Sequence, residues 1–121
     1  QEAGNDNILI TERGNTFGFD SLVTDLRSIP IMRHFGSPVI FDATHSAQIP
    51  GNHEKTTSGN REYIPSQTFA AVSSGADGIF MEIHDDVENA LSDASTQWPI
   101  SKLEKTLKSI LAFRETYLKY G

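Results

Sequence analysis

Three short apolar segments divide the chain at regular intervals. They occupy positions 8–10, 39–41 and 79–81, and each is rich in β-branched or aromatic residues. Segments this short, with apolar residues on both faces, are typical of buried strands in a parallel sheet. Their starts are roughly 30 to 40 residues apart, which is the length of one strand–helix unit.

Helical patterns fill the intervals between the strands. We expect one helix from a cap at Asp20 to a break at Pro30, and a second over 62–74 that ends at a glycine cap. A third begins with a capping box of Ser101 and Glu104 and continues with leucines at helical spacing, interrupted by one arginine. Alternation of strands and helices predicts an α/β fold with a parallel sheet.

Two longer polar stretches follow the second and third strands. Residues 49–60 lack apolar periodicity, and a loop of this length beside the strand ends is a candidate lid. Residues 85–99 form the other loop, with a helical turn expected around 87–91. Chemistry in such folds lies beyond the carboxyl ends of the strands, so both loops border the expected site.

Composition and charge narrow the possible functions. The 121 residues contain 37% hydrophobic and 21% charged positions, as in an ordinary globular domain, and the net charge is −6. That charge argues against broad binding of nucleic acid or anionic membrane. With no cysteine, no apolar span and no leader-like start, we expect a cytoplasmic protein.

Arg13 follows the first strand and is a candidate ligand for an anion. A guanidinium group binds phosphate or carboxylate through two parallel hydrogen bonds. The alternative is a structural ion pair with the neighbouring Glu12.

His45, Glu82 and Asp93 follow the second and third strands and are candidate metal ligands. One histidine and two carboxylates suit a divalent ion such as Mn, Fe, Co or Zn. The alternatives are a hydrogen bond from His45 to Asp42 and an ion pair between Glu82 and Arg13. A second histidine, His84, competes for the ligand role.

Four strings of the sequence, in this order, resemble the 3-deoxy-D-manno-octulosonate 8-phosphate synthase family. They lie at 11–18, 41–50, 80–84 and 90–97. The resemblance implies a (β/α)8 TIM barrel, of which residues 1–121 supply the carboxyl-terminal part, strands 6–8 with their helices. It also implies a transferase that condenses phosphoenolpyruvate with D-arabinose 5-phosphate and releases phosphate, in the biosynthesis of a lipopolysaccharide sugar.

The same resemblance implies roles for the candidate residues. Arg13 matches the arginine that holds the phosphate of phosphoenolpyruvate. His45, Glu82 and Asp93 match three ligands of a divalent metal, and His45 and Asp93 are the expected catalytic residues. The fourth ligand is a cysteine on the first barrel strand, which lies outside this chain.

Further implications concern the sugar phosphate and the assembly. Gln48 and Ser58 match the loop that closes over arabinose 5-phosphate. The family is usually a homotetramer, and the amino-terminal half of the barrel has to come from the same or another chain. Two alternatives remain: the related 3-deoxy-D-arabino-heptulosonate 7-phosphate synthase, and a piece that is inactive without the rest of the barrel.

Overall fold

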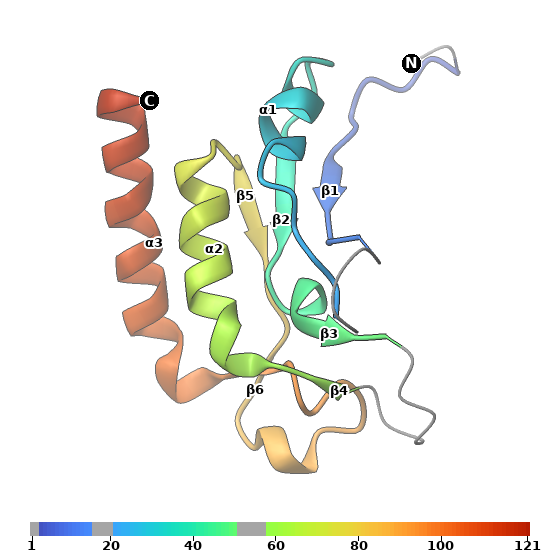
Figure 1. Ribbon diagram of the computed structural model, residues 1–121, viewed down its shortest axis with the longest axis vertical. Coiled ribbons are helices and arrows are strands. Elements are labelled where there is room, and N and C mark those ends of the chain that lie inside the picture. Colours follow the sequence, from blue (N-terminus) through green and yellow to red (C-terminus); the bar gives the residue numbers. More distant parts are fainter. Residues whose placement is uncertain (1–2, 16–20, 51–57) are drawn as a thin grey trace.

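A three-stranded parallel sheet forms the centre of the molecule (Figure 1). The structure is a computed structural model that describes residues 3–15, 21–50 and 58–121. The strands are β1 (Ile10–Glu12), β2 (Val39–Asp42) and β5 (Gly78–Phe80), in the spatial order β1-β2-β5. The predicted α/β class with parallel strands is therefore confirmed.

Two strands are displaced by one or two residues from their predicted positions. Ile10 pairs with Val39, so β1 begins after the exposed Leu9 rather than at position 8. Gly78 pairs with Ile40, so β5 begins one residue before the apolar segment. Apolar content locates a buried strand, whereas the pairing decides where it begins.

The first helix differs from its prediction. Helix α1 (Ser28–Arg33) begins eight residues after Asp20, which lies outside the described residues, and continues past Pro30. Pro30 is in the first turn, where a backbone N–H group has no acceptor within the helix. The lack of an N–H group in proline therefore costs no helical hydrogen bond. The residues before α1 are held instead by an isolated antiparallel bridge between Asn15 and Val23.

Helix α2 (Ile64–Ser73) confirms the second helical prediction, including the glycine cap. Gly75 has a φ of +99°, in the left-handed region, and its N–H donates to the carbonyl of Val72. A Cβ atom at this position would lie 2.6 Å from the hydroxyl oxygen of Tyr117. Both the turn and the close approach of the last helix therefore require glycine.

Helix α3 (Ile100–Tyr120) lies alongside α2 at the edge of the molecule (Figure 1). The rings of Phe69 and Phe113 stack between the two helices with centroids 4.8 Å apart. The predicted capping box is wrong, because α3 begins before Ser101 and has no side-chain cap. Arg114, the interruption in the apolar stripe, donates to the carbonyl of Ala76.

Short elements gather beyond the carboxyl ends of the strands (Figure 1). They are η1 (His45–Ala47), β3 (Gln48–Ile49), β4 (Ser58–Gly59), η2 (Arg61–Tyr63), β6 (Ile83–His84), η3 (Val87–Asn89) and β7 (Trp98–Pro99). Strand β3 pairs antiparallel with β4, so the two ends of the candidate lid are joined; its residues 51–57 lie outside the described ones. The η3 turn confirms the helical turn expected in the second loop.

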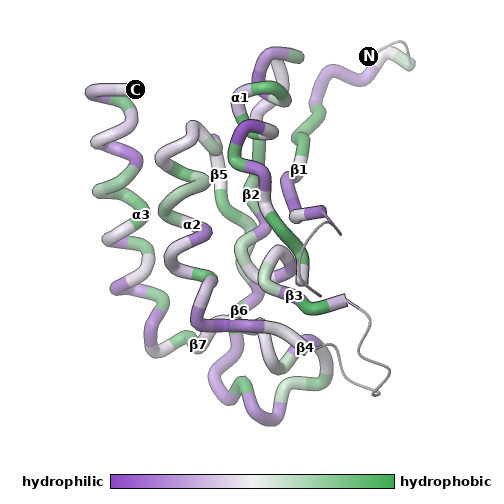
Figure 2. Tube along the Cα trace, in the orientation of Figure 1, coloured by the Kyte–Doolittle hydropathy of each residue, from purple (hydrophilic) through white to green (hydrophobic). Residues whose placement is uncertain are grey.

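The core lies between the sheet and the helices. Val39 and Phe41 on β2 are fully buried and belong to one cluster with Ile29 of α1 and Ile64 of α2. Figure 2 shows hydrophobic colour along β2 and β5 and at intervals along α3. The opposite face of the sheet is open at Phe80, which is 47% exposed. Among the described helices, none combines the length and the hydropathy needed to cross a membrane.

Candidate metal centre

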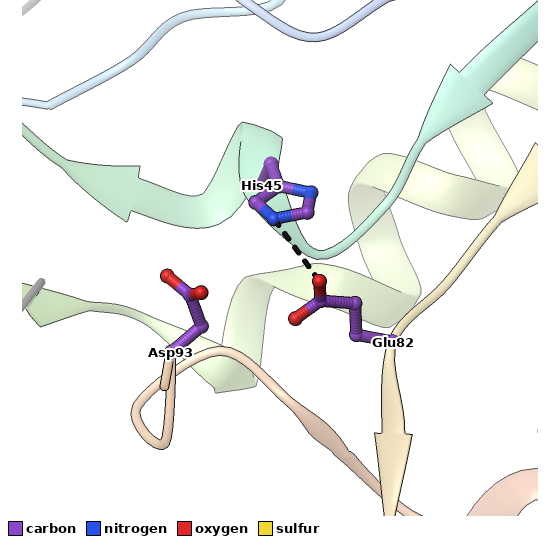
Figure 3. A group of neighbouring side chains, drawn as sticks. All are labelled: His45, Glu82 and Asp93. Carbon is purple, nitrogen blue, oxygen red and sulfur yellow. Dashed lines mark ion pairs between the residues drawn. The ribbon is translucent and has the colours of Figure 1, made fainter. Parts of the chain in front are cut away.

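His45, Glu82 and Asp93 converge beyond the carboxyl ends of the strands (Figure 3). Each offers one ligand atom, and these atoms all lie within 4.8 Å of one another. His45 opens η1 directly after β2, Glu82 lies between β5 and β6, and Asp93 is in the loop before β7. Neighbouring parallel strands end at the same edge of the sheet, which brings together residues up to 48 positions apart in the sequence.

Asp42 fixes the orientation of the His45 ring. Its Oδ2 lies 2.8 Å from Nδ1 of His45, and its Oδ1 accepts the backbone N–H of the same residue at 3.0 Å. Because a carboxylate only accepts, Nδ1 carries the hydrogen and a neutral ring keeps its lone pair on Nε2. Phe80 stacks against the ring with centroids 5.9 Å apart. The contact between His45 and Asp42, given above as the alternative to a ligand role, is thus present, and it leaves Nε2 for a metal.

Glu82 faces His45 with one carboxylate oxygen, while the other lacks a partner. Its Oε1 lies 3.4 Å from Nε2 of His45, and its Oε2 is buried with no hydrogen-bond partner among the described residues. The backbone of Glu82 is held on both sides. Its N–H donates to Oγ1 of Thr44 at 3.2 Å, and its carbonyl accepts from Trp98 N–H at 2.8 Å.

Asp93 is in an unusual backbone conformation. Its φ is +51°, in the left-handed region where non-glycine residues are uncommon. Its carbonyl accepts the N–H groups of Thr96 and Gln97, which closes a tight turn. Arg61 of η2 donates to the carbonyl of Ala94, so a second segment holds the backbone next to the carboxylate. Strained residues of this kind are concentrated at functional sites.

The chemistry of these groups fits a divalent metal ion. One imidazole nitrogen and two carboxylates are the ligand types that Mn, Fe, Co and Zn accept. Leaving a buried carboxylate oxygen without a partner is costly, and a cation would remove that cost. The unpartnered Oε2 of Glu82 is therefore an observation in favour of a metal at this position.

Arg13 reaches the cluster through Gln48. Its Nη2 donates to Oε1 of Gln48 at 3.0 Å, and Nε2 of Gln48 donates to Oδ1 of Asp93 at 2.7 Å. The alternative ion pairs of Arg13, with Glu12 or Glu82, do not form. The buried Glu12 instead accepts the N–H of Gly14 and the hydroxyl of Ser28.

Two candidates lie apart from the cluster. Ser58 is on β4 opposite Ile49, and no hydrogen bond among the described residues joins its side chain to the metal candidates. Nδ1 of His84 lies 3.2 Å from Asp85 and accepts the N–H of Asp86, so His84 is not part of the group. Sequence patterns missed Arg61, because an arginine before a helix has no feature that links it to a loop 33 residues away.

An open pocket of about 530 Å³ is lined by Asn15 and residues 23–27. Its charged pair is Asp25 and Arg27, whose Nη2 lies 2.7 Å from Oδ2 of Asp25. The side-chain hydrogen bond from Arg27 lowers the pKa of Asp25, and the same bond raises the pKa of Arg27. None of the metal candidates lines this pocket.

A family model described as "DAHP synthetase I family" matches residues 1–118. The chain belongs to the DAHP synthetase I family. The chain is also similar to curated proteins named 2-dehydro-3-deoxyphosphooctonate aldolase. The relative from Legionella pneumophila (strain Lens) is 49% identical over 118 residues, which cover 98% of this chain and 43% of the relative.

Two further relatives carry the same name. The one from Hydrogenovibrio crunogenus is 45% identical over 121 residues, covering 100% of this chain and 44% of the relative. The one from Synechococcus is 49% identical over 115 residues, covering 95% of this chain and 40% of the relative. The chain thus spans less than half the length of the curated relatives that it matches.

Proposed function

We propose that this chain is part of an enzyme that condenses phosphoenolpyruvate with D-arabinose 5-phosphate, giving 3-deoxy-D-manno-octulosonate 8-phosphate and phosphate. The observation that carries the proposal is the convergence of His45, Glu82 and Asp93, with Arg13 joined to Asp93 through Gln48. Close relatives named 2-dehydro-3-deoxyphosphooctonate aldolase support the choice of this substrate pair.

The residues of the site have separate tasks in this reaction. Arg13 binds the phosphate of phosphoenolpyruvate, since its guanidinium group is exposed and aims one nitrogen toward the cluster. His45 and Asp93 are the proposed catalytic residues, on the basis of their convergence with Glu82. Gln48 and Ser58 are assigned to the side of arabinose 5-phosphate, at the base of the β3–β4 hairpin.

A divalent ion of the Mn, Fe, Co or Zn type is held by Nε2 of His45 and by the carboxylates of Glu82 and Asp93. When bound, such an ion acts as a Lewis acid that polarises an oxygen of the substrate. Asp42 keeps the imidazole in the tautomer that presents Nε2. A cysteine from outside this chain is the proposed fourth ligand.

The chain is proposed to form strands 6–8 of a (β/α)8 barrel, together with their helices. Strand order β1-β2-β5 follows the order in the sequence, as in a barrel, whereas a doubly wound sheet reverses direction. The exposed Phe80 lies on the sheet face that the interior of a barrel would cover. An amino-terminal half with five strand–helix units completes the barrel, and the assembled enzyme is proposed to be a homotetramer.

A substrate comparison tests the proposed reaction. The assembled barrel, meaning this chain joined to the amino-terminal part that its relatives contain, is given phosphoenolpyruvate and one of two aldoses. We expect phosphate release with arabinose 5-phosphate and little with erythrose 4-phosphate. Release with erythrose 4-phosphate alone would favour the second candidate, 3-deoxy-D-arabino-heptulosonate 7-phosphate synthase, which the description of the matched family supports.

Unfolding of the isolated chain tests the proposed barrel. We expect residues 1–121 alone to unfold without a sharp transition and to release no phosphate, because three strands cannot close a barrel of typically about 250 residues. Circular dichroism during urea titration gives the answer. A cooperative two-state transition of the isolated chain would contradict the proposal.

A further inference from the structure

Gln48 joins two parts of the site that have different chemistry. It accepts a hydrogen bond from Nη2 of Arg13 at 3.0 Å and donates one to Oδ1 of Asp93 at 2.7 Å. The partners come from three separate segments: the residues after β1, strand β3 and the loop before β7. A cation site and an anion site are thereby connected by one side chain.

The amide of Gln48 can make both of these contacts at once, because it carries an acceptor oxygen and a donor nitrogen. Arginine offers donors alone and an ionised carboxylate offers acceptors alone, so the residue between them needs an acceptor on one end and a donor on the other. Glutamate at position 48 would pair with Arg13 but repel Asp93. Methionine has a similar length and would make neither hydrogen bond.

The backbone of Gln48 is anchored, so its side chain has a defined origin. Gln48 pairs with Gly59 across the β3–β4 hairpin, and its carbonyl accepts the N–H of Leu22 at 3.3 Å. A Cβ at Gly59 would lie 2.1 Å from Cγ2 of Thr96, so the hairpin packs directly on the turn that carries Asp93. The Gln48 backbone is therefore fixed relative to the turn that carries Asp93.

We propose that Gln48 is a positioning residue that couples metal binding at Asp93 to anion binding at Arg13. A metal ion that fixes the Asp93 carboxylate also fixes the amide of Gln48, which in turn holds the guanidinium group of Arg13 in place. By linkage, an anion on Arg13 tightens metal binding by the same factor. The inference rests on the proposed function for the identity of the anion as a phosphorylated substrate.

The affinity for Mn²⁺ in the presence and absence of inorganic phosphate tests the coupling. Electron paramagnetic resonance on the assembled barrel measures free Mn²⁺ directly. We expect saturating phosphate to tighten Mn²⁺ binding about fivefold in the parent protein, at the lower end of typical coupling factors. In Gln48→Met the factor should fall close to one.

Two further variants separate coupling from folding. Gln48→Glu keeps a partner for Arg13 and should also lose the coupling, because it cannot donate to Asp93. Gln67→Met makes the same chemical change on α2, where the amide is only a distant acceptor, at 3.4 Å, for the hydroxyl of Ser46. That control should keep the fivefold factor, and thermal unfolding identifies any variant that has not folded.

The outcomes distinguish this inference from the proposed reaction. Fivefold coupling that persists in Gln48→Met and Gln48→Glu, or its absence from the parent protein, would overturn the role of Gln48 even if arabinose 5-phosphate is a substrate. Coupling that depends on Gln48, in a protein that does not use arabinose 5-phosphate, would support the role and refute the reaction.

Discussion

Two carboxylates at opposite ends of the same sheet have very different surroundings. Asp77, just before β5, accepts the N–H of Val39 at 3.0 Å and lies 3.4 Å from Arg33 and 3.8 Å from Arg114. Glu82, just after β5, has one buried oxygen with no partner among the described residues. Only one strand separates them in the sequence.

The difference follows from which end of the strand each one occupies. At the amino ends, Asp77 joins the start of β2 to α1 and α3, and Arg33 also donates to the hydroxyl of Tyr117. At the carboxyl ends, Glu82 is left with an unmet requirement that a metal ion would satisfy. A carboxylate whose oxygens both have partners stabilises the fold, whereas one with an unpartnered oxygen beside other ligand types is a candidate metal ligand.

The largest effect is expected from Glu82→Gln. The amide binds metal far more weakly than a carboxylate, so the affinity for Mn²⁺ should fall by more than the roughly 100-fold that loss of a partner outside the ligand set can cost. The metal-free protein should be as stable as the parent or more stable, because the buried carboxylate oxygen that lacks a partner becomes part of a neutral amide. Metal content after dialysis and urea unfolding in chelator measure the two quantities.

Asp77→Asn is the matched change at the other end of the sheet, and its effects should be reversed. We expect the free energy of unfolding to fall by about 1–2 kcal/mol, since two partly exposed ion pairs lose their charge attraction. The affinity for Mn²⁺ should change less than about twofold, because Asp77 lies at the amino ends. A stable Asp77→Asn protein with weak metal binding would break the comparison between the two ends.

Much of this arrangement could be predicted from the sequence. Three apolar segments located the strands to within two residues, and the polar residues after them located the edge at which His45, Glu82 and Asp93 meet. This works because all the strands of a parallel sheet end at the same edge. Residues that follow the strands can therefore be placed at that edge without knowledge of side-chain contacts.

Contacts between distant segments could not be predicted in this way. The bond between Gln48 and Asp93 spans 45 residues and depends on the hairpin that places β3 beside the turn. The helix expected from Asp20 was wrong because the described residues before Ser28 form an irregular segment, in which Val23 bridges to Asn15, and α1 begins only at Ser28. Local periodicity does not distinguish these two cases.

A finer test of the comparison, with a smaller loss of metal affinity than in Glu82→Gln, comes from Arg61→Met. Arg61 donates to the carbonyl of Ala94 and so supports Asp93, whose φ is +51°. Without it the turn has more freedom, and we expect the affinity for Mn²⁺ to fall about fivefold to tenfold, near the lower limit for a supporting residue. Glu88→Gln is the matched control, since Glu88 is the exposed partner of Arg61, 3.4 Å away, and its loss leaves the contact with Ala94 in place. Equal losses of affinity in both variants would mean that the ion pair between Arg61 and Glu88, and not the bond from Arg61 to Ala94, supports the metal site.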